Sequence, residues 1–328
     1  MANYRKISGV NVKSYSADPD KTYPSAFEGQ LYYNSSDGQF KFIGLGAGAW
    51  ASGGNMNTGR YDGGVAARGT NTAGLIFGGE IYPPTSAKDE TEEYNGTAWS
   101  EDGDLNAARV TVSGCGTTTA AIVSGGRLAP GPATDDCEQW NGTAWSEVAD
   151  LGTARYSVVD LGTSTASIAV GGYTGSASVT VVEQWDGSSW TEVGDLNDER
   201  YNINGFGTST AAIAAGGVDN LDKVESWDNS SWTEIAETNT DRSSGGSSGI
   251  QTDGMIYGGA PGSKADTETW NGSSWTEVAN LATARRLAGS TDGTNSSTAA
   301  IFGGMVPPGT AATEEWTLSH AFKKVTTS

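Results

Sequence analysis

Few residues of this 328-residue chain are of the types that carry acid–base, nucleophilic or metal chemistry. The single histidine, His320, lies near the end of the chain, and a Ser-His-Asp relay would need it inside a concave site. The two cysteines, Cys115 and Cys137, are not spaced as zinc ligands are. The acidic doublets Asp135–Asp136 and Asp18-Pro19-Asp20 lack the spaced oxygen ligands of a calcium loop. We therefore expect no catalytic residue, no metal site and no cofactor.

Carboxylates are the one reactive type in excess, at 39 residues. Glycoside hydrolysis needs two of them about 5–10 Å apart, a distance that some pair will meet by chance. The most regular acids are six glutamates that recur once per repeat of the pattern described below. Six equivalent copies indicate a structural duty, because a catalytic residue normally breaks a repeat.

The formal net charge is −20, so the surface repels phosphate backbones and we expect no nucleic-acid partner. No apolar run approaches the roughly 20 residues that span a bilayer, so we expect no membrane insertion. The N-terminus, MANYRKISGVNV, lacks the apolar segment of a secretory signal.

Cys115 and Cys137 fall on two strands that lie either side of a third strand, so they should be roughly 9–10 Å apart. A disulfide cannot span that distance, so we expect unpaired thiols and a reducing compartment.

The chain is dominated by an internal repeat, first visible as six glycine pairs. Successive pairs lie 47, 46, 45, 42 and 45 residues apart. The pairs are Gly78-Gly79, Gly125-Gly126, Gly171-Gly172, Gly216-Gly217, Gly258-Gly259 and Gly303-Gly304.

Three further features follow each pair in register. A Glu-x-aromatic triplet occurs at Glu92-x-Tyr94, Glu138-x-Trp140, Glu183-x-Trp185, Glu225-x-Trp227, Glu268-x-Trp270 and Glu314-x-Trp316. A second tryptophan follows five residues later, at Trp99, Trp145, Trp190, Trp232 and Trp275. Ten residues after each of these tryptophans stands an arginine, and a sixth arginine stands ten residues after Trp50. The six arginines are Arg60, Arg109, Arg155, Arg200, Arg242 and Arg285.

Each repeat has the pattern of four short antiparallel strands. In the second repeat we expect a first strand at about 110–116, a second at 120–124, a third that carries Glu138 and Trp140, and a fourth from Trp145 to about 148. The last two strands are joined by Asn-Gly, which tolerates the positive φ angles of a tight hairpin. The tetrapeptides that begin with this Asn-Gly resemble N-glycosylation sites, but the hairpin turn explains them and we expect no glycosylation. Four strands per ~45 residues make a propeller blade. The sixth repeat is complete only if Trp50 joins Trp316, so the sequence predicts an all-β, six-bladed β-propeller closed by its two ends.

These residues resemble the Kelch repeat, whose pattern is Gly-Gly after the second strand, then an aromatic, then a tryptophan. The resemblance covers about residues 46–318, and Tyr94 stands in the first blade where the others have tryptophan. It implies a propeller whose innermost strand is the first in each repeat.

Residues 1–45 do not fit the repeat, and we expect a hairpin of 31–33 and 39–43 turning at Asp37-Gly38. The segment EGQLYYNSSDGQFKF, residues 28–42, is similar to an element near the N-termini of virion structural proteins of tailed bacteriophages, particularly marine ones. That resemblance implies a particle component, made in the host cytoplasm and anchored to other virion proteins through this segment. The candidate anchor residues are Leu31, Tyr32, Tyr33, Phe40 and Phe42. The alternative is a hairpin that caps one propeller face. We expect residues 319–328 to form a C-terminal tail.

Two sets of residues are candidates for binding. The six arginines could hold an anionic ligand at one mouth of the propeller; we favour the alternative of one inter-blade hydrogen-bond anchor per repeat. The loops after each Gly-Gly vary most and share a face with the loops before each first strand. Side chains there that could contact a host glycan or protein are Tyr82, Arg127, Tyr156, Tyr173 and Tyr201. The alternative is that the tyrosines cover blade edges.

Three functions are consistent with this pattern. The leading hypothesis is a non-enzymatic virion structural protein on the particle exterior, as a tail- or fibre-associated adhesin or a decoration protein. The second is a Kelch-type protein-interaction module. The third is a propeller enzyme that cleaves glycans.

Overall fold

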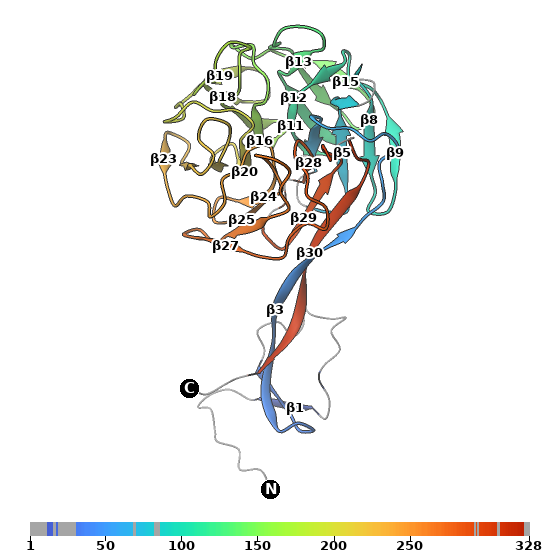
Figure 1. The fold of residues 1–328 in the computed structure, drawn as a ribbon, viewed down its shortest axis with the longest axis vertical. Helices are drawn as coiled ribbons and strands as arrows, with labels where there is room; N and C mark the ends of the chain where they lie inside the picture. The colour runs from blue at the N-terminus through green and yellow to red at the C-terminus, as the bar shows by residue number, and fades with distance from the viewer. Residues whose placement is uncertain are drawn as a thin grey trace. The chain divides into compact units, whose positions relative to one another are not determined.

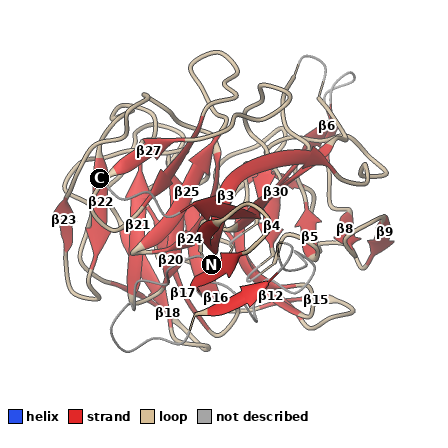
Figure 2. Cartoon of the chain, turned by 90° about the horizontal axis from the view of Figure 1, so that it is seen from below, coloured by secondary structure: helices blue, strands red, loops and turns tan. Residues whose placement is uncertain are grey.

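The chain is built entirely from strands, turns and loops in the residues that the computed structural model describes. These are residues 12–15, 18, 31–67, 70–81, 86–291, 293, 295–306 and 309–324. The contacts divide the chain into two compact units, residues 50–317 and residues 1–49 with 318–328. Within the described part of the chain there is no helix, and so none that could cross a membrane (Figure 2).

The larger unit is a ring of antiparallel sheets, which confirms the predicted six-bladed β-propeller (Figure 1). Five blades are complete four-stranded sheets that follow the chain in order. The first blade contains β4 (Gly64–Ala66), β5 (Gly74–Phe77), β8 (Thr91–Tyr94) and β9 (Trp99–Asp102), and the second contains β11 (Ser113–Thr117), β12 (Ala120–Ser124), β14 (Cys137–Trp140) and β15 (Trp145–Glu147). The third blade contains β16 (Val159–Thr163), β17 (Ala166–Val170), β18 (Val182–Trp185) and β19 (Trp190–Glu192), and the fourth contains β20 (Asn204–Thr208), β21 (Ala211–Ala215), β22 (Val224–Trp227) and β23 (Trp232–Glu234). The fifth blade contains β24 (Gly246–Ile250), β25 (Asp253–Tyr257), β26 (Thr267–Trp270) and β27 (Trp275–Glu277).

The sixth blade is assembled from both ends of the chain, as the position of Trp50 predicts. It consists of β28 (Gly289–Ser290), β29 (Thr298–Phe302), β30 (Thr313–Lys324) and the outer strand β3 (Gln39–Ser52). The ring centroids of Trp50 and Trp316 lie 5.6 Å apart, and the Gly53 N–H donates to the Thr313 carbonyl at 2.9 Å. β30 continues to Lys324, through part of the segment that we expected to be a C-terminal tail.

Two short strand pairs lie outside the blade sheets. They are β6 (Glu80–Ile81) with β7 (Ser86–Ala87), and β10 (Arg109–Val110) with β13 (Arg127–Leu128). The first strand expected at 110–116 is therefore split into β10 and β11. The break falls at Thr111, whose φ of 54° is incompatible with a continuous strand.

Aromatic side chains join neighbouring blades. In three blades, the second tryptophan of the repeat packs on an aromatic ring from the second strand of the preceding blade. The distances between ring centroids are 4.7 Å for Trp145 and Phe77, 4.9 Å for Trp99 and Phe302, and 4.8 Å for Trp50 and Tyr257. Some of these indoles also donate to a threonine across the interface, as Trp145 Nε1 does to Thr91 Oγ1 at 3.0 Å. Each large aromatic buries on the order of 150–250 Å², so these contacts are a main source of cohesion between blades.

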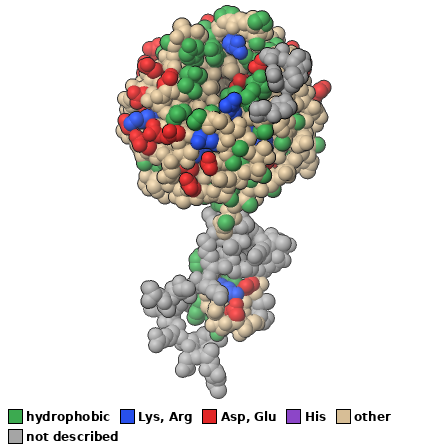
Figure 3. Space-filling view, in the orientation of Figure 1, with side chains coloured by type: hydrophobic (Ala, Val, Ile, Leu, Met, Phe, Trp, Pro, Cys, Tyr) green, Lys and Arg blue, Asp and Glu red, His purple; other side chains and the backbone are tan. Residues whose placement is uncertain are grey.

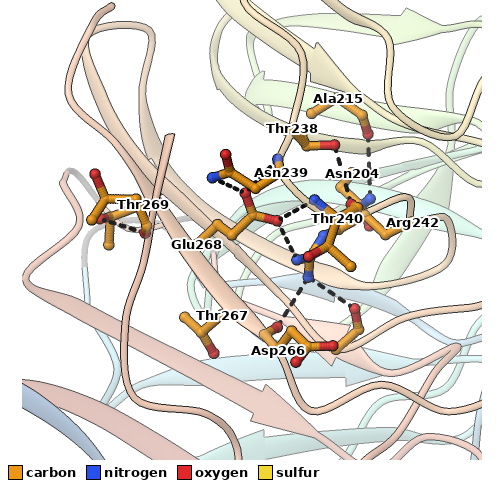
Figure 4. Close-up of polar contacts among 12 residues, drawn as sticks. Asn204, Ala215, Thr238, Asn239, Thr240, Arg242, Asp266, Thr267, Glu268 and Thr269 are labelled. Atoms are coloured by element: carbon orange, nitrogen blue, oxygen red, sulfur yellow. Dashed lines mark hydrogen bonds and ion pairs between the residues drawn. The ribbon is translucent and has the colours of Figure 1, made fainter. Parts of the chain in front are cut away.

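The repeat arginine and glutamate form a buried ion pair in every blade. In the fifth blade, Arg242 donates to Glu268 at 2.6 Å and to the carbonyls of Gly258 and Asp266 at 3.1 and 3.0 Å (Figure 4). Glu268 also accepts from the N–H groups of Asn239 and Thr240, at 2.8 and 3.1 Å. The equivalent pairs are Arg60–Glu92, Arg109–Glu138, Arg155–Glu183, Arg200–Glu225 and Arg285–Glu314. All six arginines are at most 1% exposed.

Each arginine also holds the preceding blade through its main chain. The carbonyl of Arg242 accepts from the N–H of Gly217, the second glycine of the fourth blade, at 3.0 Å. A Cβ at Gly216 would lie 2.1 Å from that same carbonyl oxygen, and the φ angle of Gly216 is +61°. The glycine pair is therefore required by this close approach. We call the arginine, its glutamate and the preceding glycine pair the blade clamp.

The smaller unit contains a hairpin with one added strand. β2 (Leu31–Asn34) pairs antiparallel with β3 as predicted, and β1 (Lys13–Tyr15) pairs parallel with β2. The turn at Asp37-Gly38 places Gly38 at a φ of 69°. A polar cluster joins Asp18 to Lys41 at 3.0 Å and to Asn34 at 2.6 Å.

Closure by β3 gives the first prediction. Deleting residues 1–56 removes the outer strand of the sixth blade and leaves an unpaired sheet edge. We expect the truncated protein to aggregate or unfold, measured by size-exclusion chromatography and circular dichroism. A monomeric truncation that melts within a few degrees of the parent would refute closure by this strand.

The blade clamp gives the second prediction. Arg242→Met leaves the carboxylate of Glu268 buried without its cation, so we expect the free energy of unfolding to fall by about 3–5 kcal/mol. The matched control is Lys223→Met, because Lys223 pairs with Glu234 and Glu237 near the surface and its loss should cost at most about 1 kcal/mol. Urea denaturation measures both, and equal small losses would contradict a structural role of the clamp.

Candidate functional site

Six residues surround one cavity lined by all six blades. Each stands two positions after a repeat arginine, and all have φ angles between 54° and 57°. We call them the collar: Asp62, Thr111, Ser157, Asn202, Ser244 and Leu287. Main-chain hydrogen bonds run around it; the N–H of Asn202 donates to the Ser157 carbonyl at 3.0 Å, and that of Ser244 donates to Asn202 at 2.9 Å. Five of the six side chains carry oxygen, so the mouth of this cavity is polar.

The cavity inside the collar has a volume of about 140 Å³ and is lined by the first strands of the blades. Equivalent positions, five residues after each arginine, are occupied by small or apolar residues except in the third blade: Val65, Gly114, Asp160, Gly205, Ser247 and Ser290. Asp160 thus breaks the sixfold pattern by placing a carboxylate on the lining.

Asp160 is 5% exposed and is held by the second blade. The Ser124 hydroxyl lies 2.8 Å from both carboxylate oxygens, and the Asp160 N–H donates to Ser113 Oγ at 2.9 Å. Burial raises the pKa of Asp160 to about 7, although these hydroxyls and Arg155 act in the opposite direction. Its carboxyl group therefore titrates near neutral pH.

Asp62 brings a second carboxyl group to the same cavity. Burial, and then the negative charge of Glu80, raises its pKa to about 7. Arg127 and Arg286 oppose that shift, which places two cationic side chains near this side of the mouth.

Four of the five predicted binding residues form one continuous row beside the collar. The guanidinium of Arg127 lies 6.0 Å from the ring centroid of Tyr156, whose ring lies 5.5 Å from that of Tyr173. The ring of Tyr173 in turn lies 5.1 Å from that of Tyr201. We call these residues the tyrosine row. The fifth, Tyr82, lies outside the described residues.

The blade loops explain why the row forms. Tyr156 and Tyr173 exchange main-chain hydrogen bonds of 3.0 and 2.8 Å, so the loop that follows an arginine pairs with the loop that follows a glycine pair. Tyr156 immediately precedes Ser157 of the collar, and Tyr201 immediately precedes Asn202. All three tyrosines are half-buried, which leaves part of each ring accessible at the mouth. On the face drawn in Figure 3, hydrophobic side chains likewise gather in patches between acidic and basic ones.

The other predicted residues lie elsewhere. The six arginines are enclosed in the blade clamps, so their guanidinium groups are not offered to an anion at the mouth. Of the candidate anchor residues, Leu31 pairs opposite Phe42 and Tyr33 opposite Phe40, which puts these four half-buried side chains on one face of the hairpin. Tyr32 points to the other face, where its hydroxyl donates to Asp18 at 2.9 Å. Both cysteines are buried, and Cys115 Sγ lies 3.8 Å from the carbonyl oxygen of Thr163.

The collar and Asp160 were not predicted from the sequence. Their signal was present, because each collar residue has a fixed spacing from its arginine and Asp160 departs from the residues at equivalent positions. Among the described residues, no group of three or more His, Cys, Asp or Glu side chains is placed to hold a metal ion.

Comparison of the chain with protein-family models and with curated proteins finds no match. The fold itself suggests a protein-interaction module.

The buried carboxyl group of Asp160 gives the third prediction. Its pKa is raised from an ordinary 3.8 to about 7, so the folded protein binds this proton more tightly than the unfolded chain does. The resulting stabilisation is complete below about pH 4 and is lost as the pH rises through 7. The asparagine of Asp160→Asn is neutral at every pH, so the variant does not lose this stabilisation as the pH rises. From pH 4 to pH 8, the free energy of unfolding of the variant should therefore increase relative to that of the parent, on the order of 2–4 kcal/mol.

Urea denaturation of parent and variant at both pH values measures this difference. Glu147→Gln, which neutralises an exposed carboxylate on β15, is the control and should show no such change. A variant-to-parent difference that is the same at both pH values would contradict a raised pKa.

Proposed function

We propose that this protein is a non-enzymatic structural component of a tailed bacteriophage particle, displayed on the exterior and used for recognition. The observation that carries the proposal is the tyrosine row beside the collar. Tyrosine and arginine are the side chains most often responsible for binding energy at recognition surfaces. Here they come from irregular loops on a rigid ring, where they contribute nothing to the repeated blade clamp.

The virion assignment is supported by the N-terminal resemblance. The segment from Glu28 to Phe42 is similar to an element of phage virion proteins, and the blades resemble Kelch repeats. In this proposal, residues 1–45 attach the protein to other virion proteins. The half-buried face formed by Leu31, Tyr33, Phe40 and Phe42 offers an apolar surface for that attachment.

The net charge of −20 also suits an exposed location. Like charges keep copies of the protein separated and soluble, and they disfavour adsorption to nucleic acid. The propeller would then present its loop face to a host-surface glycan or protein.

The fourth prediction tests the location. Mass spectrometry of purified particles should detect this polypeptide at structural abundance. Phe40→Asp should lower its incorporation into particles, because a charge on the apolar hairpin face opposes docking. Ser146→Asp, on the exposed outer strand β15, is the control and should be incorporated normally. Particles that lack the polypeptide would end the virion proposal.

A second candidate is glycan cleavage, favoured by Asp62 and Asp160 lining one cavity with pKa values of about 7. A protonated carboxyl group and a second carboxylate are the groups that glycoside hydrolysis uses. Release of reducing ends from host surface polysaccharide, abolished by Asp160→Asn, would promote this candidate over pure recognition.

A further inference from the structure

We propose that the collar and its cavity bind a single terminal sugar ring of an uncharged glycan, with the following sugars lying along the tyrosine row. This inference deepens the recognition role proposed above and rests on it for its biological setting. It is argued from the size of the cavity, from its lining and from the position of the row.

The size of the cavity matches one six-membered ring. A cavity of about 150 Å³ in a protein core accommodates benzene, and the cavity inside the collar has about 140 Å³. It is also open to solvent at the collar, so a ring can enter while still linked to a longer chain.

The lining selects a ring that carries hydroxyl groups. Hydroxyl groups both donate and accept, and the wall includes Asp62, which has a carboxyl group, and Asn202, which has an amide. The carboxyl group of Asp160 belongs to the same wall but already accepts from the Ser124 hydroxyl. Ser157 and Ser244 belong to the same wall, whereas the Ser247 hydroxyl already donates to the Gly205 carbonyl at 2.7 Å. An apolar ring would offer no hydrogen bond to Asp62 or Asn202, which is costly in a confined site.

The charges favour an uncharged sugar. In their ionised form, the carboxyl groups of Asp62 and Asp160 repel an acidic sugar inside the cavity. A bare metal cation is disfavoured as well, because Arg127 and Arg286 lie close enough to lower the pKa of Asp62. Neutral hexoses and N-acetylhexosamines meet both conditions.

The tyrosine row is the independent second observation. Sugar rings have apolar C–H faces that pack on aromatic rings, and Tyr156, Tyr173 and Tyr201 are linked ring to ring over 5.5 and 5.1 Å. Because Ser157 and Asn202 directly follow two of these tyrosines, a chain leaving the collar meets the row at once. The collar cavity would therefore bind the terminal sugar, and the tyrosine row would bind the sugars that follow it in the chain.

The test uses the purified full-length protein and defined sugars. The probes are the methyl glycosides of glucose, galactose, mannose and N-acetylglucosamine, linear tri- and tetrasaccharides of each, and N-acetylneuraminic acid as the acidic comparison. Saturation-transfer NMR and calorimetric titration should show binding of at least one uncharged probe, with the oligosaccharide bound more tightly than its monosaccharide.

Two pairs of variants separate the two parts of the site. Asn202→Gly removes the amide and keeps the positive φ, so we expect both monosaccharide and oligosaccharide binding to weaken about tenfold. Asn229→Gly is the matched control, because Asn229 has a φ of 73° in the hairpin between β22 and β23, away from the cavity lining. Tyr173→Ala should weaken the oligosaccharide about tenfold and leave the monosaccharide unchanged, and Tyr173→Phe should restore binding.

The glycan proposal is overturned if none of the uncharged probes binds the folded protein, if the acidic sugar binds best, or if Asn202→Gly and Asn229→Gly behave alike. Binding to host cells supplies a further arm: loss after periodate treatment supports a glycan, whereas loss only after protease treatment overturns it in favour of a protein partner. Detection of the polypeptide in particles is a separate measurement. The virion role can therefore fail while sugar binding stands, and the reverse.

Discussion

The buried ion pair between a repeat arginine and a repeat glutamate is the constraint on which the rest of the propeller depends. A buried charge is tolerated only when its partner and hydrogen bonds are in place. Here each guanidinium is held by a carboxylate and by main-chain carbonyls of one blade, as Arg242 is by Glu268 and Gly258. The carbonyl of the same arginine accepts a hydrogen bond from the blade before it. One residue thus fixes the distance between two blades.

Several features of the chain follow from that clamp. The glycine pair is needed because the arginine carbonyl approaches its main chain more closely than a Cβ would allow. The chain must then turn inward within two residues of the arginine, which places the collar residues in the left-handed region. Asp and Asn tolerate that conformation better than Thr111 or Leu287 do, so the presence of Asp62 and Asn202 in the collar is partly a consequence of its geometry.

The division between scaffold and site follows the division between repeated and unrepeated residues. The clamp recurs at all six junctions, including the junction of Arg60 with Gly304 across the closure of the ring. Asp160 occurs in one blade, and the tyrosine row spans only adjacent loops of the second to fourth blades. A rigid ring lets such exceptions vary without loss of the fold, because they take no part in joining blade to blade.

The sequence by itself determined the architecture. The spacing of glycine pairs, tryptophans and arginines is a local property of each repeat, so it predicted six blades, the closing strand at Trp50 and the hairpin turn at Gly38. It also indicated that the arginines are structural, and it selected Arg127, Tyr156, Tyr173 and Tyr201 as candidate binding residues. Only the tertiary structure decided that these four side chains form a single row, that Asp62 and Asp160 line the same cavity, and that Tyr32 faces away from the other anchor candidates. The first two facts depend on which loops and strands meet around a closed ring, and the third on how the hairpin packs against Asp18. All three arise from contacts between separate segments of the chain, which no local pattern encodes.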